Sequence, residues 1–417
     1  MRRAALPDQA SRTGRSRDLD GFRGFAALTV VVFHAWQFCR AGGQPDFAQQ
    51  TAGRLLGGFD GMISWFFVAS AYLLYLPVAR RILAGDDPGR AKVFLWRRAL
   101  RVLPVYWLAI LVVWAYRNPV LPGNWRDLLE HLTLTQAFDS ERIFYTIGPA
   151  WTLSAEVAFY LLVAVFLWAV RRRTAQALPR RRRVALLAAP ALVLVAGSQT
   201  YKLAEIAAGA PLERWAVWFN PLAWADNFAL GMLLALLVAS RGLRPLAGWR
   251  LALLRLVAVA LVVGMLFVPH GRPSTFVLFH SGSALGYTLL LASSVLAAPT
   301  SLWRQALGWR PLASVGAISF SFYVWHEPLL LLLDRSKLVS HDPAAFPAVA
   351  LTLVVLGLGA GWLAYQVFEL PLRRLALLMT PDGRLRRYYP EPHEPAVEPD
   401  PEPAVLTGVG GGPGLSR

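Results

Sequence analysis

Arg23 and His34 are the first residues of the chain whose type and spacing suggest chemistry. They lie eleven residues apart in an apolar stretch that runs from Asp20 to Trp36. At about 100° and 1.5 Å per residue in an α-helix, both side chains share one face, about 16 Å apart along the axis. A neutral imidazole can accept a proton near neutral pH, and a guanidinium can bind a phosphate through two hydrogen bonds. The alternative is an interfacial anchor and a structural histidine.

Further ionisable residues occur in apolar segments later in the chain. Glu156 and Tyr160 are one helical turn apart and so share a face. His326 lies on nearly the same helical face as Tyr323, and Asp60 stands at the start of another apolar segment. An ionisable group near the middle of a membrane costs about 2.5–3.5 kcal/mol, so each of these needs a compensating contact. A catalytic role and a structural hydrogen bond or ion pair both meet that need.

The composition indicates that these residues belong to a membrane protein. Of the 417 residues, 56% are hydrophobic and 16% are charged, against about 25% charged in an average soluble domain. The net charge of +17 comes from basic clusters between apolar runs, which does not favour a nucleic-acid-binding protein. A single cysteine, Cys39, excludes an internal disulfide framework. The sequence also has no cluster of metal ligands and no GxxxxGK[ST] phosphate loop.

Ten apolar segments predict an all-α membrane protein with about ten transmembrane helices. Their apolar residues are continuous rather than alternating, which favours helices over barrel strands. Of the 42 Lys and Arg residues, 32 fall on the side of the N-terminus, so we expect both termini in the cytoplasm. The expected segments are 24–39, 57–76, 103–116, 149–170, 184–200, 217–239, 251–268, 275–298, 312–333 and 345–366.

The two ends of the chain differ in composition from this central part. Residues 1–17 are polar and basic, and residues 381–417 combine Glu-Pro repeats with a glycine-rich end, which predicts a disordered tail. Between them we expect one membrane domain over residues 18–375. The first apolar segment has no small-residue cleavage site, so we expect a retained helix rather than a signal peptide. The high content of Ala, Leu and Arg is typical of a high-GC bacterium, which predicts a bacterial plasma (inner) membrane location.

Six short motifs, in order along the chain, resemble those of one family, the acyltransferase 3 family of multi-pass membrane O-acyltransferases. The first is an arginine, ten residues and a histidine after an Asp-Gly turn, matched by Arg23 and His34. One departure is Ala71, which replaces the glycine of a Phe-Phe-x-x-Ser-Gly motif. A methyl group there would narrow a close helix contact or a substrate passage. The other motifs are residues 65–70, 97–106, 151–160, 319–328 and 368–371.

The resemblance implies a membrane O-acyltransferase that moves an acyl group, usually from acyl-coenzyme A, to a hydroxyl. The expected acceptor is a glycan, a lipid-linked sugar or a secreted metabolite, and acetyl is the expected acyl group. Acyl-CoA is then a co-substrate, and no tightly bound cofactor is expected. The resemblance makes His34 the general base. It also favours Glu156 as the group that holds this imidazole in the correct tautomer. From its place on a polar stripe, we expect His326 to share proton handling, to bind the acceptor, or to belong to a structural hydrogen-bond ladder.

Contacts to the two substrates follow from the same resemblance and from position along the helices. The pantetheine arm of coenzyme A is similar in length to the gap between phosphate-binding arginine and catalytic histidine. We expect the donor phosphates to meet Arg23, Arg97, Arg98 and Arg101, of which the last three are equally expected as positive-inside anchors. We expect Asp60, Ser70, Tyr160 and Tyr323 to bind substrate, Asp60 by meeting an acceptor hydroxyl or, alternatively, by orienting His34. At the cytoplasmic end, Glu369 is expected to pair with Arg373 or Arg374.

Membrane transport is the alternative to acyl transfer. A secondary transporter or flippase for an anionic lipid or glycan would share ten helices and buried His and Glu residues. Transporters often contain two related halves, and the motifs of this sequence do not recur in a second half. The sequence therefore favours the enzyme.

Overall fold

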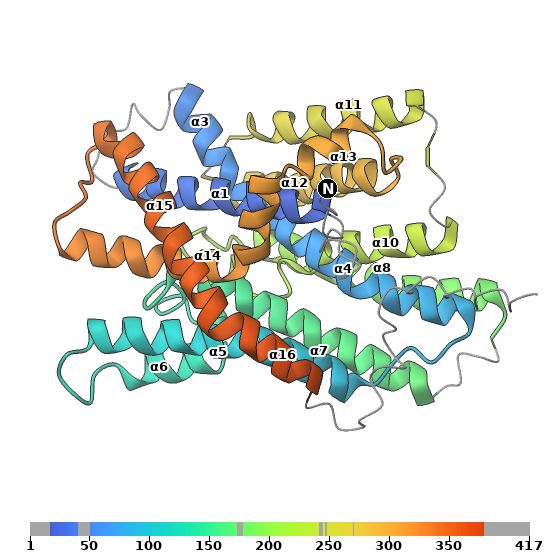
Figure 1. The fold of residues 1–417 in the computed structure, drawn as a ribbon, viewed down its shortest axis with the longest axis horizontal. Coiled ribbons are helices and arrows are strands. Elements are labelled where there is room, and N and C mark those ends of the chain that lie inside the picture. Colours follow the sequence, from blue (N-terminus) through green and yellow to red (C-terminus); the bar gives the residue numbers. More distant parts are fainter. Residues whose placement is uncertain are drawn as a thin grey trace, which may run out of the picture. The chain divides into compact units, whose positions relative to one another are not determined.

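The computed structural model describes residues 17–40, 51–172, 178–241, 245–246, 248–269 and 271–378 of the chain. These residues form helices, turns and loops with no strand among them, which confirms the prediction of an all-α membrane protein (Figure 1). Most of the basic segment 1–17 and all of the predicted tail 381–417 lie outside the described residues.

Nine helical stretches in this part of the chain are long and apolar enough to cross a membrane. Each covers most or all of one predicted segment, although the helix that contains segment 103–116 begins at Ala91, well before that segment. Their main helices are α1 (Arg17–Arg40), α4 (Met62–Ala84), α5 (Ala91–Arg117), α7 (Trp151–Arg172), α8 (Arg180–Ala207), α11 (Gly248–Met265), α12 (Pro273–Val295), α14 (Arg310–Arg335) and α15 (Phe346–Ala364). The shorter elements are α3 (Thr51–Gly57), η2 (Gly58–Gly61), α6 (Trp125–Leu132), η3 (Gln136–Phe138), η4 (Gly148–Ala150), α9 (Trp215–Trp218), α13 (Leu302–Leu307), η6 (Pro343–Ala345), η7 (Tyr365–Glu369) and α16 (Leu370–Leu378).

The remaining predicted segment, 217–239, forms the shorter helix α10 (Ala225–Arg241). The side chain of Asn220 delays its start, because Oδ1 accepts hydrogen bonds from the backbone N–H groups of Leu222 (2.9 Å) and Ala223 (3.1 Å) and so holds a turn. The 17 residues of α10 span about 25 Å, less than the apolar core of a typical bilayer. This short helix packs against α4, α8 and α12, so other helices cover much of its surface.

Helices α1 and α14 pack more closely than ordinary side chains allow. A Cβ atom at Gly316 of α14 would lie 1.7 Å from the carbonyl oxygen of Asp20, and one at Gly24 of α1 would lie 2.1 Å from that of Leu312. Small residues let membrane helices approach each other to this degree. The contact therefore depends on glycine in both helices.

Ala71, the departure from the family pattern, lies in a second close contact, between α4 and α10. A Cβ atom at Gly231 of α10 would lie 2.8 Å from Cβ of Ala71 and 2.2 Å from the carbonyl oxygen of Val68. Ala71 is fully buried. The additional methyl group thus occupies a helix contact, and the glycine on the facing helix makes room for it.

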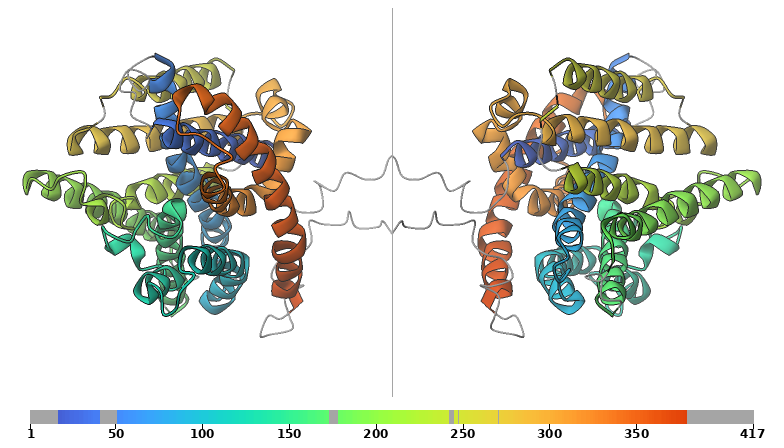
Figure 2. Two further views of the ribbon diagram at one scale, coloured as in Figure 1. Left: turned by 90° about the vertical axis from the view of Figure 1, so that its left-hand side faces the viewer. Right: turned by 90° about the vertical axis from the view of Figure 1, so that its right-hand side faces the viewer.

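Helices α15 and α16 follow each other as one helical rod, red in Figures 1 and 2, joined by the π-helical turn η7. This turn places Glu369 in the interior, where Ser321 Oγ donates a hydrogen bond to Oε2 at 2.9 Å. Nη1 of Arg373 lies 3.6 Å from Oε1 of the same carboxylate. The expected pairing of Glu369 with a nearby arginine is confirmed.

We expect Gly316→Ala to destabilise the protein by about 1–3 kcal/mol, because an added methyl group must force α1 and α14 apart. Gly359→Ala is the matched control, since a Cβ atom at Gly359 of α15 meets nothing within 4 Å and alanine is the better helix former. The measurement is the midpoint of thermal unfolding in detergent. A Gly316→Ala midpoint equal to that of the control would contradict the close helix contact.

Candidate active site

Two imidazole rings meet where α1 and α14 pack together. Nε2 of His326 lies 3.1 Å from Nδ1 of His34, and the ring centroids are 4.9 Å apart. Both residues were predicted as site residues from the sequence, and the structure brings them into contact from segments nearly three hundred positions apart. His326 is fully buried, whereas His34 keeps part of its surface exposed. We take this contact as the centre of the candidate site.

The hydrogen-bond partners determine which ring nitrogens carry protons. Nδ1 of His326 faces the carbonyl oxygen of Tyr323, to which only an N–H can donate. In a neutral ring the Nε2 of His326 is then unprotonated, so it accepts the Nδ1–H of His34, which also faces the carbonyl oxygen of Val30 at 3.0 Å. This assignment, which follows from the network of partners, leaves a lone pair on Nε2 of His34. A general base needs that protonation state.

Tyr323 and Glu327 fasten α14 to the short helix that precedes α7. The hydroxyl of Tyr323 lies 2.9 Å from the carbonyl oxygen of Pro149 and 2.9 Å from Oγ1 of Thr152. One turn farther along α14, Glu327 accepts a hydrogen bond from the backbone N–H of Gly148 at 3.1 Å. Two motifs that are far apart in the sequence therefore hold each other. Glu327 and Thr152 were not selected from the sequence, although each belongs to one of those motifs.

Glu156 belongs to a second polar cluster, which joins α4 to α7. Its Oε1 accepts hydrogen bonds from Ser70 Oγ at 3.1 Å and from the Tyr160 hydroxyl at 2.5 Å. We expected Glu156 to hold the imidazole of His34, but the ring that the structure places against that imidazole is His326. The carboxylate of Glu156 instead satisfies two hydroxyl groups.

The predicted arginines lie on the predicted cytoplasmic half of the helices. Because α1 is continuous, Arg23 and His34 keep the separation of about 16 Å that the sequence predicts. Arg98 and Arg101 of α5 interact electrostatically with Tyr160, so they lie near the Glu156 cluster. Arg97 precedes them on the same helix.

Asp60 pairs with a histidine that the sequence analysis did not select. Nε2 of His280 on α12 lies 3.5 Å from Oδ2 of Asp60. The rings of Trp224 and Phe276 lie 4.6 Å and 4.3 Å from the imidazole. Asp60 is part of η2, which contacts both α1 and α12. The signal for His280 was present, because it is an ionisable residue inside a predicted apolar segment.

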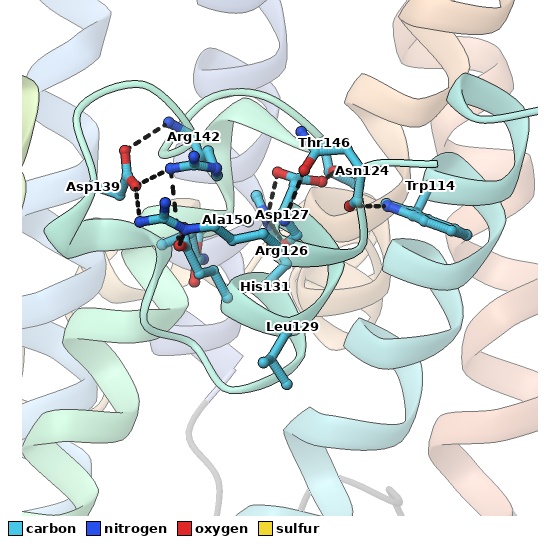
Figure 3. Close-up of polar contacts among 12 residues, drawn as sticks. Trp114, Asn124, Arg126, Asp127, Leu129, His131, Asp139, Arg142, Thr146 and Ala150 are labelled. Atoms are coloured by element: carbon cyan, nitrogen blue, oxygen red, sulfur yellow. Dashed lines mark hydrogen bonds and ion pairs between the residues drawn. The ribbon is translucent and has the colours of Figure 1, made fainter. Parts of the chain in front are cut away.

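The segment between α5 and α7 contains a network of polar contacts (Figure 3), here called the polar cap, and its elements η3 and η4 contact α7. Within it Asp127 and His131 of α6 are fully buried, with Oδ1 of the aspartate 3.1 Å from Nδ1 of the histidine. The hydroxyl of Thr146 donates to Oδ2 of the same aspartate. These buried bonds hold the loop that leads into η4 and hence to the partners of Tyr323.

A buried ion pair joins α8 to α10. Nζ of Lys202 lies 2.8 Å from Oδ2 of Asp226, and the same oxygen accepts hydrogen bonds from Gln199 Nε2 and Ser281 Oγ, each at 2.7 Å. A buried charge pair of this kind is tolerated when its remaining polar atoms are satisfied. The arrangement is that of a structural connection between α8, α10 and α12.

Comparison with known proteins identifies relatives over most of the chain. A family model described as an acyltransferase domain matches residues 16–366. The acyltransferase MdmB of Streptomyces mycarofaciens is 28% identical over 420 residues, 94% of this chain and 98% of that protein. The putative membrane-bound transacylase BcsY of Komagataeibacter xylinus is 26% identical, over 85% of this chain and 83% of its own. The O-acetyltransferase OatA of Staphylococcus aureus is 21% identical, over 85% of this chain and 57% of its own. No solved structure matches significantly.

The role of Glu156 can be tested through stability. We expect Glu156→Ala to lower the free energy of unfolding by about 1–3 kcal/mol, because the hydroxyls of Ser70 and Tyr160 lose their acceptor. Glu156→Gln should lower the free energy of unfolding less, because the amide oxygen of glutamine can still accept a hydrogen bond from these hydroxyls. Glu141→Ala is the control, because that glutamate side chain is 86% exposed. If the alanine variants at 156 and 141 unfold at the same temperature, Glu156 does not have this structural role.

Proposed function

Since the chain belongs to the acyltransferase 3 family of membrane O-acyltransferases, we propose that it transfers an acetyl group from acetyl-coenzyme A to a hydroxyl. The proposed acceptor is a glycan, a lipid-linked sugar or a secreted metabolite. The name of OatA, an O-acetyltransferase, supports the choice of acetyl. The observation that carries the proposed mechanism is the contact between His34 and His326.

His34 is the proposed general base for a direct transfer. Its Nε2 takes the proton of the acceptor hydroxyl while the hydroxyl oxygen forms a bond to the thioester carbonyl carbon. The bond from that carbon to sulfur then breaks, and the imidazolium returns the proton to the departing thiolate. The products are an O-acyl ester and free coenzyme A.

His326 is the proposed positioning residue for this base. By accepting the Nδ1–H of His34, it favours the tautomer in which Nε2 can take a proton. The carbonyl oxygen of Tyr323 fixes His326 in turn. This division of roles is that of an orienting group behind a catalytic imidazole, with a second imidazole in place of a carboxylate.

The substrates are proposed to approach the base from opposite sides. Arg23, with Arg97, Arg98 and Arg101 of α5, binds the donor phosphates on the cytoplasmic side, and the pantetheine arm spans the remaining distance to His34. Ser70 and Tyr160 both donate hydrogen bonds to Glu156, and Tyr160 also interacts electrostatically with Arg98 and Arg101 of α5, so we assign both hydroxyls to the donor path. Asp60, whose side chain is 31% exposed, remains a proposed acceptor contact together with Tyr323.

Substitution of His34 and Arg23 should separate catalysis from donor binding. We expect His34→Ala to abolish turnover with acetyl-CoA binding retained, and Arg23→Ala to raise the KM for acetyl-CoA about tenfold through loss of a charge-assisted contact. Arg40→Ala, at the opposite end of α1, is the control. The assay follows radiolabelled acetyl transfer from acetyl-CoA to a panel of hydroxylated acceptors. Equal loss of acetyl-CoA binding in both variants would refute the assignment of catalysis to His34 and donor binding to Arg23. Translocation of a substrate without acyl transfer would favour a transporter.

Substitution of His326 should lower the rate of acyl transfer without changing the affinity for acetyl-CoA. We expect His326→Ala to lower kcat about 10–10²-fold with little change in KM, because the Nδ1–H of His34 then keeps only the carbonyl oxygen of Val30 as acceptor and the ring is held less firmly. His326→Gln should restore part of the rate, since its amide oxygen can accept the Nδ1–H of His34. The dependence of kcat on pH, measured for wild type and both variants, reports on the base. Wild-type kcat in the alanine variant would rule out the positioning role.

A further inference from the structure

Arg255 is a charged residue on a membrane-spanning helix that the proposed reaction does not use. It lies seven residues into α11, about 10 Å from the start of the helix. Its Nε and Nη2 atoms are buried, and neither has a hydrogen-bond partner in the described part of the chain. Leaving charged N–H groups buried without an acceptor is unfavourable. The side chain therefore needs an acceptor that the described part of the chain does not provide.

The guanidinium of Arg255 is held against a fixed aromatic surface. Its Cζ lies 5.2 Å from the ring centroid of Trp303 on α13, which is a cation–π contact. The indole N–H of Trp303 donates to Oγ of Ser294 on α12 at 2.8 Å. The Trp303 ring, which serves as a platform for the guanidinium, is thus held by a hydrogen bond to α12. Arg255 therefore lies at a junction of three helices, α11, α12 and α13.

The surrounding sequence contains no carboxylate that could neutralise Arg255. Residues 227–326, which include α11, α12 and α13, hold no aspartate or glutamate. The acid that α13 does bind is Asp18 of α1, whose two carboxylate oxygens lie 2.8 Å and 3.4 Å from Nε and Nη2 of Arg304. That carboxylate is already paired, and among the described residues nothing accepts a hydrogen bond from Nε or Nη2 of Arg255.

We propose that Arg255 and Trp303 form a binding site for a phosphate ester on the predicted cytoplasmic side of α11 and α13. A guanidinium donates two parallel hydrogen bonds to phosphate oxygens, and an aromatic face keeps it oriented for that geometry. Two sources carry this chemistry. One is the phosphates of the acyl-CoA donor, a choice that rests on the proposed function, and the other is the headgroup of an anionic phospholipid.

The test compares wild type with Arg255→Gln and Arg250→Gln. Arg250 is the matched control, because it lies on the same helix and its Cζ is 5.2 Å from the ring of Trp249, yet it is exposed. One arm measures acetyl-CoA affinity in phosphatidylcholine nanodiscs. The other measures, by native mass spectrometry, how much phosphatidylglycerol the purified protein retains. We expect Arg255→Gln to reduce one of the two quantities about tenfold and Arg250→Gln to leave both within about twofold of wild type.

Each outcome decides the proposal. A loss confined to acetyl-CoA affinity identifies the donor as the ligand, and a loss of phosphatidylglycerol identifies the lipid. No loss in either arm overturns the site. If Arg255→Gln is not recovered as a monodisperse protein, Trp303→Leu, which removes the platform and no charge, carries the same expectation. Acetyl transfer by wild type in the same preparations tests the proposed function separately, because the lipid arm decides the site even if wild type does not use acetyl-CoA.

Discussion

The contact between His34 and His326 depends on a helix packing that only glycine allows. Gly24 and Gly316 remove the side chains that would separate α1 from α14, so the two imidazoles approach within hydrogen-bond distance. The bonds of Tyr323 to Pro149 and Thr152 then set the position of α14 against α7. The polar cap before α7 supports the loop that supplies those partners. The close approach of the α1 and α14 backbones, rather than any single polar bond, is therefore what allows the two histidines to meet.

The sequence predicted most of the architecture because membrane helices follow simple rules. Continuous apolar length predicts each crossing, and the arrangement of basic residues between crossings predicts orientation. The exception was α10, which is too short for a typical crossing because it begins at Ala225 instead of residue 217, after a turn that the Asn220 side chain holds. That turn depends on one hydrogen-bonding side chain, to which hydropathy is not sensitive. The selected site residues nevertheless included both members of the histidine pair.

The partners of the site residues could not be predicted in the same way. His326 and Glu156 lie at similar expected depths, and which of them meets His34 depends on how closely α1 approaches α14. The pairing of Asp60 with His280 was not predicted either, because it also depends on which helices face each other. The depth of a residue in the membrane can be counted along its own helix. Which helix it faces, and how that helix is rotated, depends on packing between segments far apart in sequence.

The π-helical turn at η7 gives the rod formed by α15 and α16 one place where the chain can lose a residue with little rotation of α16. Such a turn contains one residue more than an α-helical turn. Removal of one position there would be absorbed by a return to ordinary α-helical winding, whereas removal of one position within α15 would rotate everything that follows by about 100°. After such a rotation the carboxylate that now meets Ser321 would no longer face it, so this junction tolerates a one-residue deletion better than the helix before it does.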